Sequence, residues 1–105
     1  MNLNEYQIKA EAFHAFKSPQ YPYFALAEEV GEFMGKMAKA HRGDYQGTAD
    51  ELDLALKKEL GDVLWNVAAI ASLHGWTLES VAEMNLDKLT DRKERGVIKG
   101  TGDER

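Results

Sequence analysis

The sequence is best interpreted from two short acidic motifs, Glu28-Glu29-Val30-Gly31-Glu32 and Glu59-Leu60-Gly61-Asp62. In each motif two acids lie three residues apart, with a glycine directly before the second acid. Residues three apart share one face of a helix. Two helices packed through these faces would bring four carboxylates together, and converging carboxylates require a cation. The motifs therefore predict two facing helices that hold a cation site, with the glycines at points of close backbone approach.

The spacing of apolar residues around these motifs predicts an all-α chain. Four helices are expected, over about residues 2–16, 22–41, 48–74 and from residue 77 into the segment 91–96. The expected N-terminal caps are Asn2 or Asn4, Thr48 and Thr77, because short polar side chains accept hydrogen bonds from free amides. Gly43 is the expected C-terminal cap, because glycine adopts the left-handed backbone conformation. We expect one domain over residues 1–105, with about residues 93–105 as a flexible C-terminal tail.

Composition excludes several classes of protein. The net charge of −5 argues against general attraction to nucleic acid or to an anionic membrane. The absence of cysteine excludes a disulfide scaffold, a thiolate zinc site and cysteine catalysis. No basic N-terminal region precedes an apolar run, and no apolar segment approaches ~20 residues. We therefore expect a cytoplasmic protein without a signal peptide or a membrane span.

Glu59 is the acid whose position is hardest to explain without a cation. It falls inside the apolar stripe of the third helix, and burying an unpaired carboxylate costs several kcal/mol or shifts its pKa until it is neutral. Lys36, Lys57 and Lys58 are candidate ion-pair partners, but they are too few to neutralise all four acids. A hard divalent ion with oxygen ligands fits better, and Mg²⁺ is the usual ion where carboxylates meet phosphates. A solvated acidic face remains the alternative for the second helix.

The third helix also predicts self-association. Its second half is apolar nearly all round, as expected of a helix covered on two sides. One small chain does not supply both covers, so we expect a second copy to complete the bundle as a homodimer or tetramer. Trp65 would then lie in the core or at the dimer interface, with stacking on a base as the alternative.

The two acid pairs resemble the signature of the MazG-like all-α nucleoside triphosphate pyrophosphohydrolases. Further segments resemble single-domain members of this family in the same order along nearly the whole chain: Glu5-Tyr6-Gln7, Glu59 to Trp65, Asn85-Leu86-x-Lys88-Leu89-x-x-Arg92 and the ending from Arg95 to Arg105. The resemblance implies Mg²⁺-dependent hydrolysis of a nucleoside triphosphate to the monophosphate and pyrophosphate, with Mn²⁺ as an alternative ion.

The resemblance also implies residue roles. Glu29, Glu32, Glu59 and Asp62 match the metal ligands, and Glu28 matches the extra acid, which would orient or deprotonate the attacking water. Lys88 and Arg92 lie four apart, so one helix face can present both, with Asn85 one turn earlier. By resemblance Asn85 and Lys88 contact phosphates, and Arg92 and Arg95 are further candidates. A non-catalytic nucleotide-sensing module and a metal-free helical interaction protein are the alternative functions.

Overall fold

The computed structural model describes residues 1–104, which form four helices and no β-strand. The helices are α1 (Leu3–Glu11), α2 (Tyr21–Arg42), α3 (Ala49–Leu73) and α4 (Leu78–Glu94). The expected all-α class is confirmed. Within residues 1–104, no helix combines the length and the apolar character needed to cross a membrane.

The predicted caps are present at the helix ends. The side chains of Asn2, Thr48 and Thr77 accept hydrogen bonds from amides in the first turns of α1, α3 and α4. At the end of α2, Gly43 has a φ of 86°, a left-handed conformation that glycine adopts without steric cost. These local signals therefore fix three helix starts and one helix end.

The first helix is shorter than predicted, since it ends at Glu11 rather than near residue 16. The amides of Phe13 and His14 donate to carbonyls only three residues earlier, those of Ala10 and Glu11. The chain then leaves the helix. His14 and Phe16 turn toward Trp65 on α3, with ring centroids 5.5 and 5.7 Å from the Trp65 ring. Packing of these rings on α3 replaces the last turn of the expected helix.

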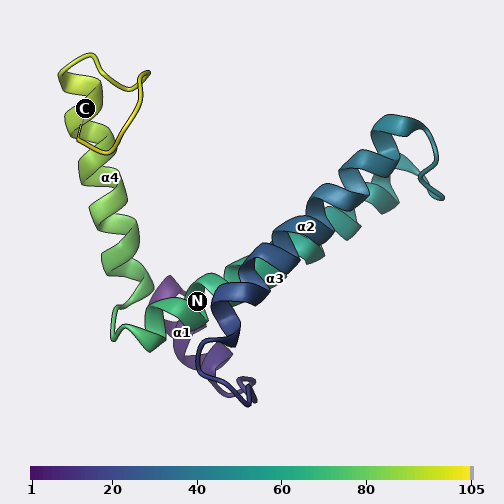
Figure 1. Ribbon diagram of the computed structural model, residues 1–105, viewed down its shortest axis with the longest axis horizontal. Helices are drawn as coiled ribbons and strands as arrows, with labels where there is room; N and C mark the ends of the chain where they lie inside the picture. Colours follow the sequence, from purple (N-terminus) through teal and green to yellow (C-terminus); the bar gives the residue numbers. More distant parts are fainter. Residues whose placement is uncertain (105) are drawn as a thin grey trace.

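Helices α2 and α3 form a long antiparallel pair joined at one end by the loop 43–48 (Figure 1). Helix α1 packs against α3 and α4 at the other end of this pair. Helix α4 leaves that end in a different direction, and within residues 1–104 it does not pack against α2 (Figure 1). The α2–α3 pair and α4 are therefore two arms that meet near α1.

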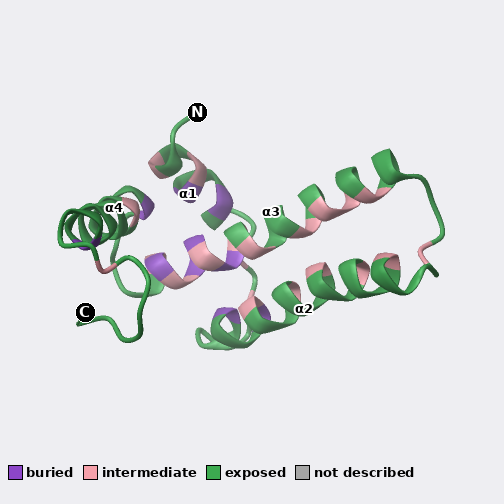
Figure 2. Cartoon of the chain, turned by 90° about the horizontal axis from the view of Figure 1, so that it is seen from above, coloured by how far each residue is buried: buried purple, intermediate pink, exposed green. Residues whose placement is uncertain are grey.

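The buried core is small and lies where the arms meet. Figure 2 shows the buried residues concentrated on α1, on the adjoining half of α3 and at the starts of α2 and α4. The buried apolar residues are Ala10, Ala25, Ala68, Ala69, Ala71 and Leu78. Alanine lets helices approach closely but buries little apolar area, so this core stabilises the junction and leaves both arms thinly covered.

Gln7 connects three elements at the junction. Its amide nitrogen donates to the Ser72 hydroxyl at 3.0 Å and to the Trp76 carbonyl at 2.9 Å. Its amide oxygen accepts from the backbone amide of Leu78 at 2.8 Å. Gln7 is 6% exposed. One buried side chain on α1 therefore satisfies polar groups at the end of α3, in the connecting turn and at the start of α4.

The chain has an unusually large surface for its mass. Its accessible area is 7966 Å², whereas a compact monomer of 11.8 kDa exposes about 5,900 Å². Its radius of gyration is 16.8 Å, compared with about 13 Å for a compact domain of this length. One copy of the chain therefore leaves about 2,000 Å² more surface in water than a typical monomer does.

We predict that Gln7→Ala lowers the free energy of unfolding by roughly 3 kcal/mol, because several buried polar groups lose their partner together. Urea denaturation followed by circular dichroism measures this loss. Gln46→Ala is the matched control, since Gln46 is exposed in the α2–α3 loop, and it should change stability by less than about 0.5 kcal/mol. Equal effects of the two substitutions would contradict the role of Gln7.

Candidate functional site

The α2–α3 pair brings the two acidic motifs together. Glu28, Glu29 and Glu32 lie on α2, and Glu59 and Asp62 lie on the facing helix α3. Carboxylate oxygens of Glu28, Glu29 and Glu32 lie within 4.8 Å of one another. Oxygens of Glu29, Glu59 and Asp62 satisfy the same limit, so Glu29 belongs to both groups. All five predicted acids therefore form two overlapping triads, which we call the acid cluster.

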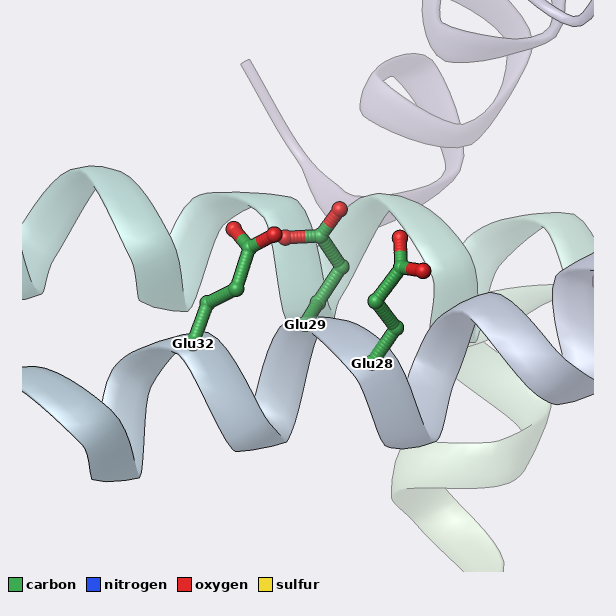
Figure 3. A group of neighbouring side chains, drawn as sticks. All are labelled: Glu28, Glu29 and Glu32. Carbon is green, nitrogen blue, oxygen red and sulfur yellow. The ribbon is translucent and has the colours of Figure 1, made fainter.

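Side-chain directions divide the members of the acid cluster. Figure 3 shows Glu28, Glu29 and Glu32 extending from the same side of α2, with the carboxylates of Glu29 and Glu32 meeting and that of Glu28 beside them. Glu29 and Glu59 are half-buried, whereas the other three acids are exposed. The cluster thus has an inner pair at the helix interface and an outer set open to solvent.

The inner pair carries carboxylate oxygens without partners. Oε2 of Glu29 and Oε2 of Glu59 are buried, and neither accepts a hydrogen bond. The Lys36 ammonium lies 3.4 Å from Oε1 of Glu59 and neutralises part of the charge. Buried oxygens in this state cost free energy unless they are protonated or ligate a cation. The donor set, all carboxylate oxygen, fits Mg²⁺ or another hard divalent ion.

Burial and repulsion act together on Glu29. Burial raises the pKa of Glu29 most, and the charges of Glu32, Asp62 and Glu59 add to the effect, so that its pKa reaches about 7. Hydrogen bonding to the Glu32 carboxyl contributes in the same direction. Glu29 is therefore about half protonated at neutral pH when no cation is bound, and a cation bound there would displace that proton.

The motif glycines do not mark a close approach within one chain. A Cβ added at Gly31 or at Gly61 would meet no atom within 4 Å. The expectation that these glycines let α2 and α3 approach is therefore wrong for a single copy, because both positions face away from the partner helix. Gly61 instead lines an open apolar hollow of about 390 Å³ together with Leu60, Leu64 and Val67.

The predicted phosphate-binding residues lie on the other arm. Asn85, Lys88, Arg92 and Arg95 are on or directly after α4, which does not pack against α2 within residues 1–104. Lys88 and Arg92 do share one face, as predicted, and both contact Asp103. Arg95 donates to Asp91 at 2.9 Å. One copy of the chain therefore assembles the acids and, separately, a cationic face, without joining them.

The sequence did not indicate the cavity that aromatic side chains line beside the second half of α3. His14 and Phe16 line a cavity of about 310 Å³ with Ala69 and Leu73. Nε2 of His14 is buried there without a hydrogen-bond partner. The Trp65 ring packs against His14 and Phe16, and its indole nitrogen donates to the Ala10 carbonyl at 3.3 Å, so Trp65 is partly buried between α1 and α3. The prediction of a helix over about residues 2–16 concealed this arrangement, because the structure places His14 beyond the end of α1.

We predict that the metal-free protein loses stability as the pH rises from about 5 to about 8. In this interval the folded chain holds a proton on Glu29 that the unfolded chain has released, so the free energy of unfolding falls with increasing pH. Glu29→Gln should flatten this slope, and Glu83→Gln, an exposed acid on α4, should leave it unchanged. Thermal unfolding at a series of pH values in the presence of a chelator measures the slope. A Glu29→Gln slope as steep as that of the wild type would contradict the raised pKa.

Comparisons with known proteins show the family to which the chain is similar. Residues 18–97 match the family model described as the MazG nucleotide pyrophosphohydrolase domain. The chain is 41% identical to the Gene 37 protein of Mycobacterium phage L5 over 85 residues, which are 81% of this chain and 75% of that protein. It is 32% identical to YvdC, an uncharacterized protein of Bacillus subtilis (strain 168), over 75 residues, 66% of this chain and 70% of YvdC.

A solved structure shares the fold. The crystal structure of iMazG from Vibrio DAT 722 is similar with a TM-score of 0.63 and 34% sequence identity. The similarity covers 90% of this chain and 97% of the iMazG chain. The family model and the shared fold, together with the acid cluster on the facing helices, show that the chain belongs to the MazG family.

Proposed function

We propose that the protein hydrolyses a nucleoside triphosphate between its α and β phosphates, in a Mg²⁺-dependent reaction that yields the monophosphate and pyrophosphate. The observation that carries the proposal is the acid cluster, in which five carboxylates converge and two buried oxygens lack partners. Membership in the MazG family supports a nucleotide substrate. Structural ion pairing alone does not account for the cluster, since Lys36 is the single cation found beside it among residues 1–104.

Each acid has a role in this proposal. Glu29, Glu32, Glu59 and Asp62 would hold the ion, and their negative charge would be neutralised by it. When bound, such an ion neutralises phosphate charge and lowers the pKa of a coordinated water. Glu28 is exposed and lies against Glu29 and Glu32, so its carboxylate is placed to orient the attacking water and accept its proton. Mn²⁺ has the same preference for oxygen ligands and is the expected substitute.

The reaction needs positive charge from the protein as well, because the phosphates carry charge that the acids cannot stabilise. Lys88 and Arg92 supply it on α4, with Asn85 one turn away and Arg95 at the end of the helix. These residues lie on a different arm from the acid cluster within one chain. We therefore propose that the complete site forms in a homodimer or tetramer, where α4 of one copy can lie near the acid cluster of another.

The surface of the chain supports self-association. The excess area of about 2,000 Å² per chain is larger than the about 800 Å² that each partner buries in an interface of standard size. Leu60 and Leu64 are exposed beside Gly61 around the apolar hollow on α3. The open position at Gly61 would let a second helix approach closely, which a side chain there would prevent. This face of α3 is the proposed contact with a second copy.

We predict that the purified protein releases pyrophosphate from at least one ribo- or deoxyribonucleoside triphosphate when Mg²⁺ is present. Glu59→Gln should lower kcat/KM by about 100-fold or more, because it removes a charged ligand from the inner pair. Glu83→Gln is the matched control and should retain activity. An enzyme-coupled assay for pyrophosphate over a panel of nucleotides measures both.

A second measurement separates catalysis from binding. Mg²⁺ should raise the melting temperature of the wild type and not that of Glu59→Gln. Stabilisation by Mg²⁺ and nucleotide without any pyrophosphate release would contradict the proposed hydrolysis and favour a nucleotide sensor.

We predict that Leu60→Asp shifts the protein to a smaller oligomer, because it places a charge in the proposed apolar contact. Leu54→Asp is the matched control, since Leu54 lies on the same helix with similar exposure, 54% compared with 56%, and does not line the hollow. Sedimentation velocity at micromolar concentration measures the species present. A wild-type protein that sediments as a monomer would contradict the proposed assembly.

A further inference from the structure

The chain folds back along α4 after the helix ends. Gly96 has a φ of 72°, and the amide of Val97 donates to the Arg92 carbonyl at 2.8 Å, which closes the helix and reverses the chain. The following segment returns beside α4 as a loop without regular structure (Figure 1). We call residues 97–104 the tail. Its return brings Asp103 next to Arg92 and Lys88, which lie 11 and 15 residues earlier in the chain.

Asp103 contacts both cations on the predicted phosphate-binding face. A guanidinium nitrogen of Arg92 donates to the Asp103 carbonyl at 2.8 Å and to its Oδ1 at 3.3 Å. The Lys88 ammonium donates to the same Oδ1 at 3.3 Å. A hydrogen bond from Lys88 lowers the pKa of Asp103 most, and a hydrogen bond from Arg92 adds to the effect. The Asp103 carboxylate is therefore charged at neutral pH. One carboxylate oxygen is therefore held between two cations.

A phosphate oxygen could accept the same two hydrogen bonds that Oδ1 of Asp103 accepts from Lys88 and Arg92. Arginine and lysine bind carboxylate and phosphate oxygens through the same charge-assisted hydrogen bonds. The Arg92 side chain is 6% exposed, while that of Asp103 is 83% exposed, so the tail covers the arginine and leaves its own carboxylate at the surface. A phosphate cannot reach the covered guanidinium nitrogen while Asp103 holds that position.

We propose that Asp103 is an internal competitor for the phosphate-binding face of α4, and that a nucleotide must displace it to contact Lys88 and Arg92. This inference rests on the proposed function, because it takes Lys88 and Arg92 as the residues that bind substrate phosphates. The tail then regulates how substrate reaches α4. While the tail lies on α4 it lowers the affinity for phosphate, and its release exposes Lys88 and Arg92 together.

Release of the tail should require little free energy. Ion pairs at the surface contribute weakly because water screens them, and the Asp103 carboxylate is exposed. Residues 98–104 are all exposed, so this part of the tail buries little apolar surface. Gly100 and Gly102 have φ values of 146° and 83°, which glycine tolerates and which leave the released segment many conformations. A triphosphate, with more negative charge than one carboxylate, should therefore win the competition.

Asp103→Asn in the full-length chain tests the competition. It removes the charge and keeps the shape and the backbone carbonyl that Arg92 contacts. Asp87→Asn is the matched control, because Asp87 is next to Lys88, is exposed and gives the same change in net charge. Calorimetry with inorganic tripolyphosphate and Mg²⁺ should show about fivefold tighter binding by Asp103→Asn and less than about twofold change for Asp87→Asn.

Hydrogen exchange supplies a readout that does not depend on turnover. The amide of Val97, which donates to the Arg92 carbonyl, should exchange faster in the wild type when tripolyphosphate binds, because the tail is released. Slower exchange, or weaker or unchanged binding of tripolyphosphate by Asp103→Asn, would overturn the inference. The tail would then have only a structural role at the end of α4. If the wild type releases pyrophosphate while Asp103→Asn binds no tighter, only this inference fails. If neither protein binds tripolyphosphate or nucleotide, the proposed function fails with it.

Discussion

Repulsion among carboxylates at the α2–α3 interface is the constraint on which the rest of the structure depends. Oxygens of Glu29, Glu59 and Asp62 lie within 4.8 Å of one another at a partly buried helix interface. Like charges at this distance oppose the packing of the two helices that carry them, and one lysine neutralises only part of the charge. In the proposed function a bound cation would relieve this repulsion, so that stability given up in the metal-free chain would serve the site.

The sequence predicted the parts of this fold that are decided locally. Caps at Thr48 and Thr77 and the stop at Gly43 depend on hydrogen bonds within a few residues and on one backbone angle. The convergence of the acids was also predictable, because the spacing of Glu29 with Glu32 and of Glu59 with Asp62 places each pair on one helix face. Antiparallel packing of two helices joined by a short loop then brings the pairs together.

What the sequence could not supply depends on contacts between distant segments. The first helix ends early, and His14 and Phe16 pack on Trp65 instead of continuing it. The local sequence does not indicate this contact, because Trp65 is distant along the chain. Gly31 and Gly61 looked like contact points because glycine is costly inside a helix, but the direction that each faces depends on the register of α2 against α3. The separation of α4 from the acid cluster likewise follows from the junction, which periodicity along one helix does not describe.

The connection through Gln7 has a mechanical consequence. Helix α4 has 17 residues and is roughly 25 Å long, and within residues 1–104 its hydrogen bonds to α1 lie at its first turn. It is therefore a lever arm, and a rotation of about 10° at Leu78 would move its far end by about 4 Å. Gln7 and Asn4, which bind the amides of Leu78 and Glu79, set the angle of this lever from α1. The N-terminal helix thus determines where the distant cations of α4 come to lie, although it carries none of them.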